Sequence, residues 1–191
     1  MDADFSIELG RDDPALDFPW SDLGGKFYYF DLKRHPELLS RISEATPFPE
    51  LAEFLRTVNL PRTMVESAKC DVWTTNEISA EEEIFGASSK CASYVDLVFS
   101  DIEQRRSFPL HELFARRLVE LLRRTPETPS GMELCVRRCY FRDEAGISDG
   151  FYWTLYVNGY GDDAARARQN WGIALKLVGN AVLQLSTVGL A

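Results

Sequence analysis

Two stretches of the chain show the same succession of hydrophobic and polar positions. Residues 94–100 and 152–158 each begin with Tyr and alternate like a half-buried strand, and the second stretch follows the first by 58 residues. Hydrophobic residues then recur at three- and four-residue spacing in residues 109–124 and 163–186, which is the pattern of an amphipathic helix. Another strand-like run precedes each copy, so the pattern predicts a strand–strand–helix unit written twice.

These two units predict the core of the fold. Short connections and right-handed crossovers leave few arrangements for such a chain. The simplest is one four-stranded antiparallel sheet with the two long helices on one face, in a permuted ferredoxin-like order. We therefore expect an α+β fold with a pseudo-duplicated ββαββα core. The four strands fall at residues 69–75, 89–100, 132–141 and 151–158, with the second and fourth side by side at the centre.

The first part of the chain predicts short elements only. Residues 5–9 and 26–32 have strand-like patterns, and an irregular stretch rich in Asp, Pro and Gly separates them. Two short helices, over residues 36–44 and 49–58, open with Pro, whose missing N–H costs nothing in the first turn. The order of elements from residue 27 to residue 99 resembles one module of the GyrI-like ligand-binding fold, and this resemblance implies a ligand-binding role.

The length and the composition predict how the parts are organised. The chain has 191 residues, of which 45% are hydrophobic and 27% charged, as in one globular domain with a packed core. In this single domain (1–191) we expect an N-terminal extension, residues 1–61, to pack on the two units, which span residues 68–126 and 131–187.

The charge and the terminal segments restrict partners and location. A net charge of −9 argues against nucleic acid as a partner, because phosphate contacts require a basic footprint, whereas it suits a basic protein. The N-terminus has no basic and apolar segment typical of a secretory signal. The apolar residues 173–191 are interrupted by Lys176, Asn180 and Gln184, which favours a buried helix over a membrane span. We expect a cytoplasmic protein with no membrane contact.

The central strands predict two different sheet faces. Val95, Leu97 and Phe99 should face the helices, together with Trp153, Leu155 and Val157. The other face is aromatic and polar, and Trp73 and either Arg137 or Arg138 are expected to join it from the flanking strands. We take six residues of this face as candidate binding residues: Trp73, Tyr94, Asp96, Arg137, Tyr152 and Tyr156.

Asp96 is the most informative of these residues. A carboxylate in the middle of a central strand is costly to bury unless it is paired or hydrated. Its partner is expected to be Arg137, Arg138 or Lys69. The alternative is that Asp96 is a polar anchor in a ligand pocket.

No motif predicts catalysis, a metal or a cofactor. Gly146 to Gly150 match the Gly-x-Ser-x-Gly pattern of hydrolases, but a strand follows where that motif needs a helix, so a hairpin turn is the better interpretation. Cys135 and Cys139 would lie about 13 Å apart on one strand, too far for a shared zinc ion or a disulfide. The histidines, His35 and His111, lack an adjacent nucleophile.

These observations leave two functional hypotheses. In the first, the protein is not an enzyme and acts by binding through the aromatic and polar sheet face, as a homodimer or with a basic protein partner. In the second, a small molecule binds in a pocket between the sheet and the N-terminal segment, with or without weak enzymatic activity.

Overall fold

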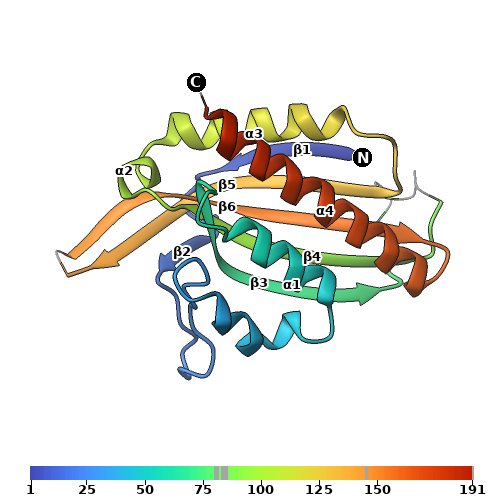
Figure 1. Ribbon diagram of the computed structural model, residues 1–191, viewed down its shortest axis with the longest axis horizontal. Helices are drawn as coiled ribbons and strands as arrows, with labels where there is room; N and C mark the ends of the chain where they lie inside the picture. The colour runs from blue at the N-terminus through green and yellow to red at the C-terminus, as the bar shows by residue number, and fades with distance from the viewer. Residues whose placement is uncertain (80–81, 83–85, 145, 191) are drawn as a thin grey trace.

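The protein is an α+β fold built on one mixed sheet of six strands, seen in a computed structural model that describes residues 1–79, 82, 86–144 and 146–190 (Figure 1). The strand order is β1-β5-β6-β4-β3, and β2 pairs with a further part of β5. The strands are β1 (Asp2–Glu8), β2 (Ala15–Phe18), β3 (Val65–Thr75), β4 (Ser89–Phe99), β5 (Ser130–Asp143) and β6 (Gly146–Gly161). The helices are η1 (Pro36–Arg41), η2 (Ser43–Ala45), α1 (Pro49–Val58), α2 (Ile102–Arg105), α3 (Phe108–Arg123) and α4 (Ala164–Val188).

The sheet is wider than the predicted four strands. β5 is 14 residues long, and its outer edge pairs in parallel first with β1 and then with β2. An unpaired edge of this length would expose a row of backbone N–H and C=O groups, which the N-terminal chain satisfies. The four antiparallel strands of the prediction are thus part of a mixed sheet, and neither an internal duplication nor a ferredoxin-like order is shown.

The predicted pair of central strands is confirmed. β4 and β6 are adjacent and antiparallel, with Tyr94 opposite Tyr156 and Asp96 opposite Thr154. β6 also pairs with β5 along its length, and this hairpin extends beyond the rest of the sheet in Figure 1. The Gly-x-Ser-x-Gly segment lies at the start of β6, so its serine belongs to a strand and not to a nucleophile elbow.

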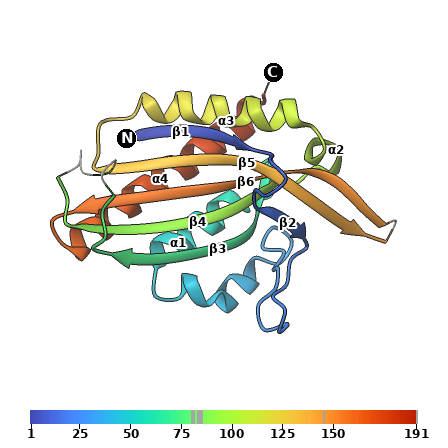
Figure 2. The ribbon, with the colours of Figure 1, turned by 180° about the vertical axis from the view of Figure 1, so that it is seen from behind.

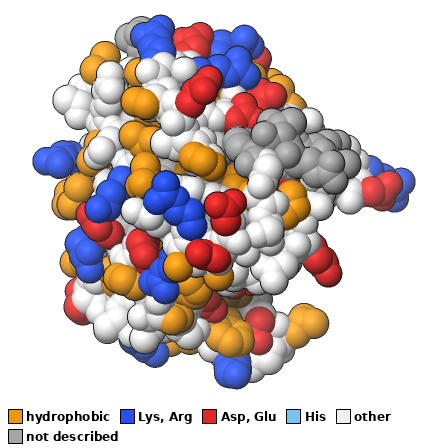
Figure 3. Space-filling view, turned by 90° about the vertical axis from the view of Figure 1, so that its right-hand side faces the viewer, with side chains coloured by type: hydrophobic (Ala, Val, Ile, Leu, Met, Phe, Trp, Pro, Cys, Tyr) orange, Lys and Arg blue, Asp and Glu red, His pale blue; other side chains and the backbone are white. Residues whose placement is uncertain are grey.

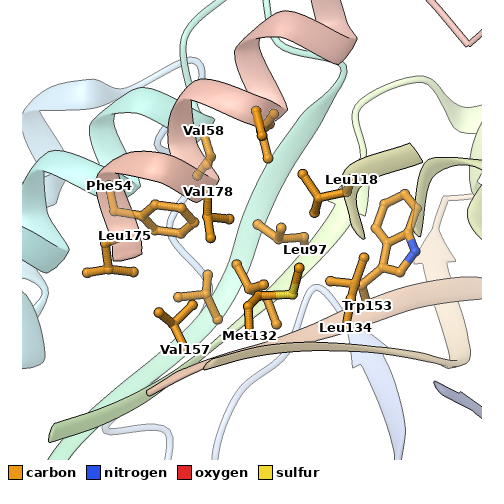
Figure 4. Packing of buried hydrophobic residues seen from close by; sticks show 14 of the residues in the cluster. Phe54, Val58, Leu97, Leu118, Met132, Leu134, Trp153, Val157, Leu175 and Val178 are labelled. Atoms are coloured by element: carbon orange, nitrogen blue, oxygen red, sulfur yellow. The ribbon is translucent and has the colours of Figure 1, made fainter. Parts of the chain in front are cut away.

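The helices α1, α3 and α4 all cover one face of the sheet, called the helix face here (Figures 1 and 2). The six helix-facing residues predicted for the central strands all belong to the main hydrophobic cluster. Figure 4 shows Leu97 and Trp153 of the sheet pointing toward side chains of the helices, among them Leu118, Leu175 and Phe54. Burial of these large side chains, at about 1.5–3 kcal/mol each, is the main force that holds the two layers together.

α4 is the helix of the described residues that is long and apolar enough to cross a membrane by length and composition. It packs on β4 and β6 instead, and Trp171, Leu175 and Val178 of α4 are buried in the main cluster. This is the environment of a core helix in a folded domain.

The N-terminal extension divides between the two faces. α1 packs on the helix face, whereas β2 and the chain after it cover one end of the opposite face, called the second face here (Figure 2). There Leu16 and Phe18 are buried against Val98 and Tyr152.

The strand predicted at residues 26–32 is wrong. Tyr29 donates its backbone N–H to Trp20, Phe27 donates to Asp22, and only one isolated bridge joins Ser21 to Tyr28. These local bonds around the glycines of the turn replace a sheet ladder. The strand–helix–strand–strand order on which the GyrI-like resemblance rested is therefore not formed.

Candidate functional site

A row of polar side chains crosses the middle of the second face. The Thr154 hydroxyl donates to Asp96 Oδ1 at 2.7 Å and accepts from Arg137 Nη1 at 2.9 Å. The Arg137 guanidinium then pairs with the Glu8 carboxylate, at 2.7 Å between Nη2 and Oε2. At the other end of the row, Lys69 of β3 lies opposite Asp96 in the strand register. Side-chain hydrogen bonds and the ion pair therefore link four strands, β4, β6, β5 and β1, and Lys69 continues the row on β3 by its register position alone.

Burial makes the Asp96 carboxyl group unusually weakly acidic. Its residue is only 6% exposed. Loss of hydration raises the pKa of Asp96 to about 6, against the opposing influence of the Thr154 hydrogen bond and of the Lys69 and Arg137 charges. Asp96 therefore has a protein partner, which is Thr154 directly and Arg137 only through Thr154, and it is not among the lining residues of the pocket at the edge of β3.

The structure separates the six candidate binding residues into two groups. Asp96, Arg137 and Tyr152 are buried, and Tyr152 packs under the N-terminal extension. Trp73, Tyr94 and Tyr156 remain at least partly exposed, and Trp73 is the most exposed at 39%. The Tyr94 and Tyr156 rings lie 6.4 Å apart.

The strand register also decides between the two arginines. Arg137 lies opposite Tyr152, whereas Arg138 lies opposite Phe151, which packs with the helix-face residue Phe108. Arg137 is thus the residue on the second face.

A pocket of about 520 Å³ lies along the free edge of β3, between this strand, the chain before η1 and the start of η2. We call it the β3-edge pocket. Five consecutive residues of β3, from Ser67 to Asp71, form its floor, and Tyr94 contributes from the neighbouring strand. Its other lining residues are Trp20, Asp22, Lys26, Phe27, Tyr28, Phe30, Leu32, Arg41, Ile42, Ser43, Glu44 and Leu55.

Hydrogen bonds fix one wall of the β3-edge pocket. Trp20 Nε1 donates to the Ala68 carbonyl oxygen at 2.6 Å, which ties the N-terminal segment to the edge of β3. The Lys69 ammonium lies 5.2 Å from the centre of the Trp20 ring and 5.7 Å from that of Tyr94. The lysine thus lies against two aromatic rings, an arrangement that a cation and a ring quadrupole favour.

The opposite wall is built around Arg41. Its Nη2 donates to the Tyr28 hydroxyl at 2.8 Å, and its guanidinium lies 5.0 Å from the centre of the Phe30 ring. The Tyr28 and Phe30 rings are themselves in contact, with centres 4.7 Å apart. Aromatic and cationic side chains therefore alternate around the pocket.

The Cys70 thiol in this pocket is not activated as a nucleophile. Burial first, and then the carboxylates of Glu44, Asp71 and Asp96, raise the pKa of Cys70 to about 12. Because the thiolate is the nucleophilic form, a thiol with this pKa is unreactive at neutral pH. Among the described residues, no group of three or more His, Cys, Asp and Glu side chains is placed to hold a metal ion.

Of the six candidate binding residues, Tyr94 alone lines the β3-edge pocket, and Lys69 is predicted from the sequence only as a partner of Asp96. The signal in the sequence is the run of aromatic residues at 27–30, whose pattern predicts a strand and not the wall of a pocket. Elsewhere, on the side shown in Figure 3, acidic, basic and hydrophobic side chains are interspersed over the surface. A concave site is therefore a better candidate than a flat patch on that side.

Comparison of the chain with protein-family models, with curated proteins and with solved structures finds no match. The functional argument therefore depends on the geometry of the site.

Proposed function

We propose that this protein binds a small organic molecule in the β3-edge pocket. The observation that carries the proposal is the pocket itself, whose volume of about 520 Å³ falls in the range of about 300–1,000 Å³ found for ligand sites. Its walls combine the aromatic and apolar side chains typical of such sites with six charged groups of both signs, which can orient a ligand.

Binding fits the lining better than catalysis does. The Cys70 thiol and the Tyr94 phenol, two of the lining groups, both have a pKa raised by burial, and no histidine lies among the lining residues that the structure describes. General acid–base catalysis requires a group whose pKa lies near the working pH. We accordingly propose a binding protein and not an enzyme.

An uncharged fluorescent probe tests the proposal. N-phenyl-1-naphthylamine should bind saturably with one probe per chain, and Ser43→Trp should weaken it at least about tenfold, because Ser43 is exposed at the wall and a large side chain there fills the space. Ser40→Trp is the matched control, since Ser40 is exposed in the neighbouring helix η1 and does not line the pocket.

The result that would refute a pocket function is equally definite. If the native protein shows no saturable probe binding, or if Ser43→Trp and Ser40→Trp bind the probe as the native protein does, the β3-edge pocket is not a ligand site.

Self-association through the second face is a second candidate, favoured by the exposed Trp73 and the Tyr94–Tyr156 pair. Such aromatic residues are typical interface anchors, and a homodimer or a basic partner would suit them and the net charge of −9. Tyr156→Glu should then lower the sedimentation coefficient, whereas Tyr140→Glu, on the projecting hairpin, should not. Unchanged sedimentation of both variants would count against this interface.

The location in the cytoplasm, the pseudo-duplication and the permuted ferredoxin-like order stay predictions from the sequence. The proposal of a small-molecule site uses none of them.

A further inference from the structure

We infer that the β3-edge pocket takes an organic anion with a flat aromatic body, and that Lys69 holds its acid group. The inference rests on the proposed binding function, and it adds the chemical class of the ligand and the residue that selects it.

Lys69 is a half-buried cation whose hydrogen-bonding capacity is not used by the described part of the chain. Among the described residues no carboxylate forms an ion pair with Lys69, and no acceptor of a hydrogen bond from its ammonium is found. Its contacts are the faces of the Trp20 and Tyr94 rings, which attract its charge without accepting its three N–H groups in ordinary hydrogen bonds. An acid group that enters the pocket would meet these donors.

The carboxylate opposite Lys69 in the strand register has a hydrogen-bond partner elsewhere. Asp96 lies opposite Lys69 across the strands, and its Oδ1 accepts the Thr154 hydroxyl inside the buried row. Arg137 contributes a second positive charge to Asp96 through this row. The Asp96 carboxylate is therefore shared, and it does not occupy the pocket, since it is not among the lining residues.

Two further cations face the same space. Arg41 uses one N–H group for the Tyr28 hydroxyl and keeps others of its five donors, and Lys26 lies 5.0 Å from the centre of the Phe27 ring. Neither side chain forms an ion pair with a carboxylate among the described residues. The positive groups of the pocket thus remain open to an anion.

Each of the three carboxylates of the lining accepts a hydrogen bond from the protein. Asp22 accepts the Phe27 backbone N–H at 2.8 Å, and Asp71 accepts the Val72 backbone N–H at 2.7 Å. Glu44 accepts the Ser43 hydroxyl at 3.0 Å. Each carboxylate has a donor from the adjoining chain, whereas the Lys69 ammonium has no acceptor among the described residues. Each of these carboxylates keeps further lone pairs, as Arg41 keeps further donors, and the lining charges are balanced. Lys69 differs from them because none of its three N–H groups has an acceptor among the described residues.

The negative net charge does not outweigh this local arrangement. Charges farther away than about 8 Å are largely screened at physiological ionic strength, so the −9 of the whole chain acts weakly inside the pocket. Contact with an ammonium at hydrogen-bonding distance is worth more than this residual repulsion. The aromatic body of the ligand then covers the rings and the apolar side chains of Leu32 and Ile42.

A matched pair of probes tests the inference. 8-Anilinonaphthalene-1-sulfonate is N-phenyl-1-naphthylamine with an added sulfonate, so their affinity ratio reports the charge preference alone. In the native protein the sulfonate probe should bind about tenfold more tightly. In Lys69→Gln the ratio should fall to about one, with the affinity for the uncharged probe unchanged. Lys176→Gln, at an exposed lysine of α4, should keep the native ratio.

The outcomes separate the two proposals. If the sulfonate probe binds no more tightly than the uncharged probe, or if the preference survives Lys69→Gln, the inference of an anionic ligand is overturned while the pocket stands. If neither probe binds the native protein, the pocket function fails, and the inference fails with it.

Discussion

The buried Asp96 carboxyl group should make the stability of the protein depend on pH between about pH 4 and pH 6. Its pKa is about 6 in the folded protein and 3.8 in an ordinary environment. Because the folded state holds this proton more tightly, protonation favours folding. The stabilisation is complete below about pH 3.8 and is lost as the pH rises through about 6.

The size of the effect follows from the shift. A difference of about two pKa units corresponds to about 3 kcal/mol, at 1.36 kcal/mol per unit. Asp96 is 6% exposed, so solvent screening reduces this figure little. Asp96→Asn keeps an acceptor for the Thr154 hydroxyl and cannot ionise. The stability of this variant relative to the native protein should therefore increase by about 2 of these 3 kcal/mol between pH 4 and pH 7.

Urea denaturation followed by circular dichroism at several pH values measures this difference directly. Asp149→Asn, at an exposed position of β6, controls for the removal of a carboxylate from the surface. If the difference between Asp96→Asn and the native protein stays constant over this pH range, the argument from burial is wrong.

Two further predictions compare pairs of similar positions: two glycines, one of which lies close to a neighbouring backbone, and two helix N-caps, one of which makes a capping hydrogen bond. A methyl group at Gly159 would lie 2.1 Å from the Trp171 backbone nitrogen, so Gly159→Ala should lower the free energy of unfolding by about 3 kcal/mol or more in the same urea titration. A methyl group at Gly131 has nothing within 4 Å, so Gly131→Ala should change this free energy by less than about 1 kcal/mol. Asp163 accepts the Arg166 backbone N–H at the start of α4, so Asp163→Ala should lower the stability of the protein by about 1 kcal/mol. Ser107→Ala should lower it little, because the Ser107 side chain makes no such bond to α3. Equal melting temperatures of these two variants would contradict this reasoning.

The part of the fold that could be predicted from the sequence is the part that local periodicity determines. The spacing of hydrophobic residues located α3 and α4, and Pro in the first turn marked the start of α1. Alternation located the central strands and assigned Leu97 and Trp153 to the helix face. The parallel pairing of β1 with β5 could not be predicted, because it joins residues 129 apart in the chain, such as Ser6 and Cys135, and no local pattern encodes such a contact.

The candidate site divides in the same way. A carboxylate in a central strand was a sufficient signal that Asp96 has protein partners. The β3-edge pocket was visible only as aromatic residues at 27–30 and as Trp20, because it forms where two irregular segments meet the edge of a strand. Irregular segments are positioned by tertiary contacts, and these contacts have no sequence period.

The position of Lys69 shows how one residue connects the fold to the proposed site. Glu66 lies opposite Val98 and Lys69 lies opposite Asp96, so these side chains share the second face although they are three residues apart. Strict alternation would place them on opposite faces. The register shift between Ser67 and Lys69 inserts one extra residue in β3, and this β-bulge returns Lys69 to the same face of the sheet as Glu66. Without it, Lys69 would lie on the helix face and bury its charge in the core. The bulge therefore places Lys69 opposite Asp96 and in the lining of the pocket. In the sequence, the bulge is indicated by two polar residues three positions apart, at 66 and 69.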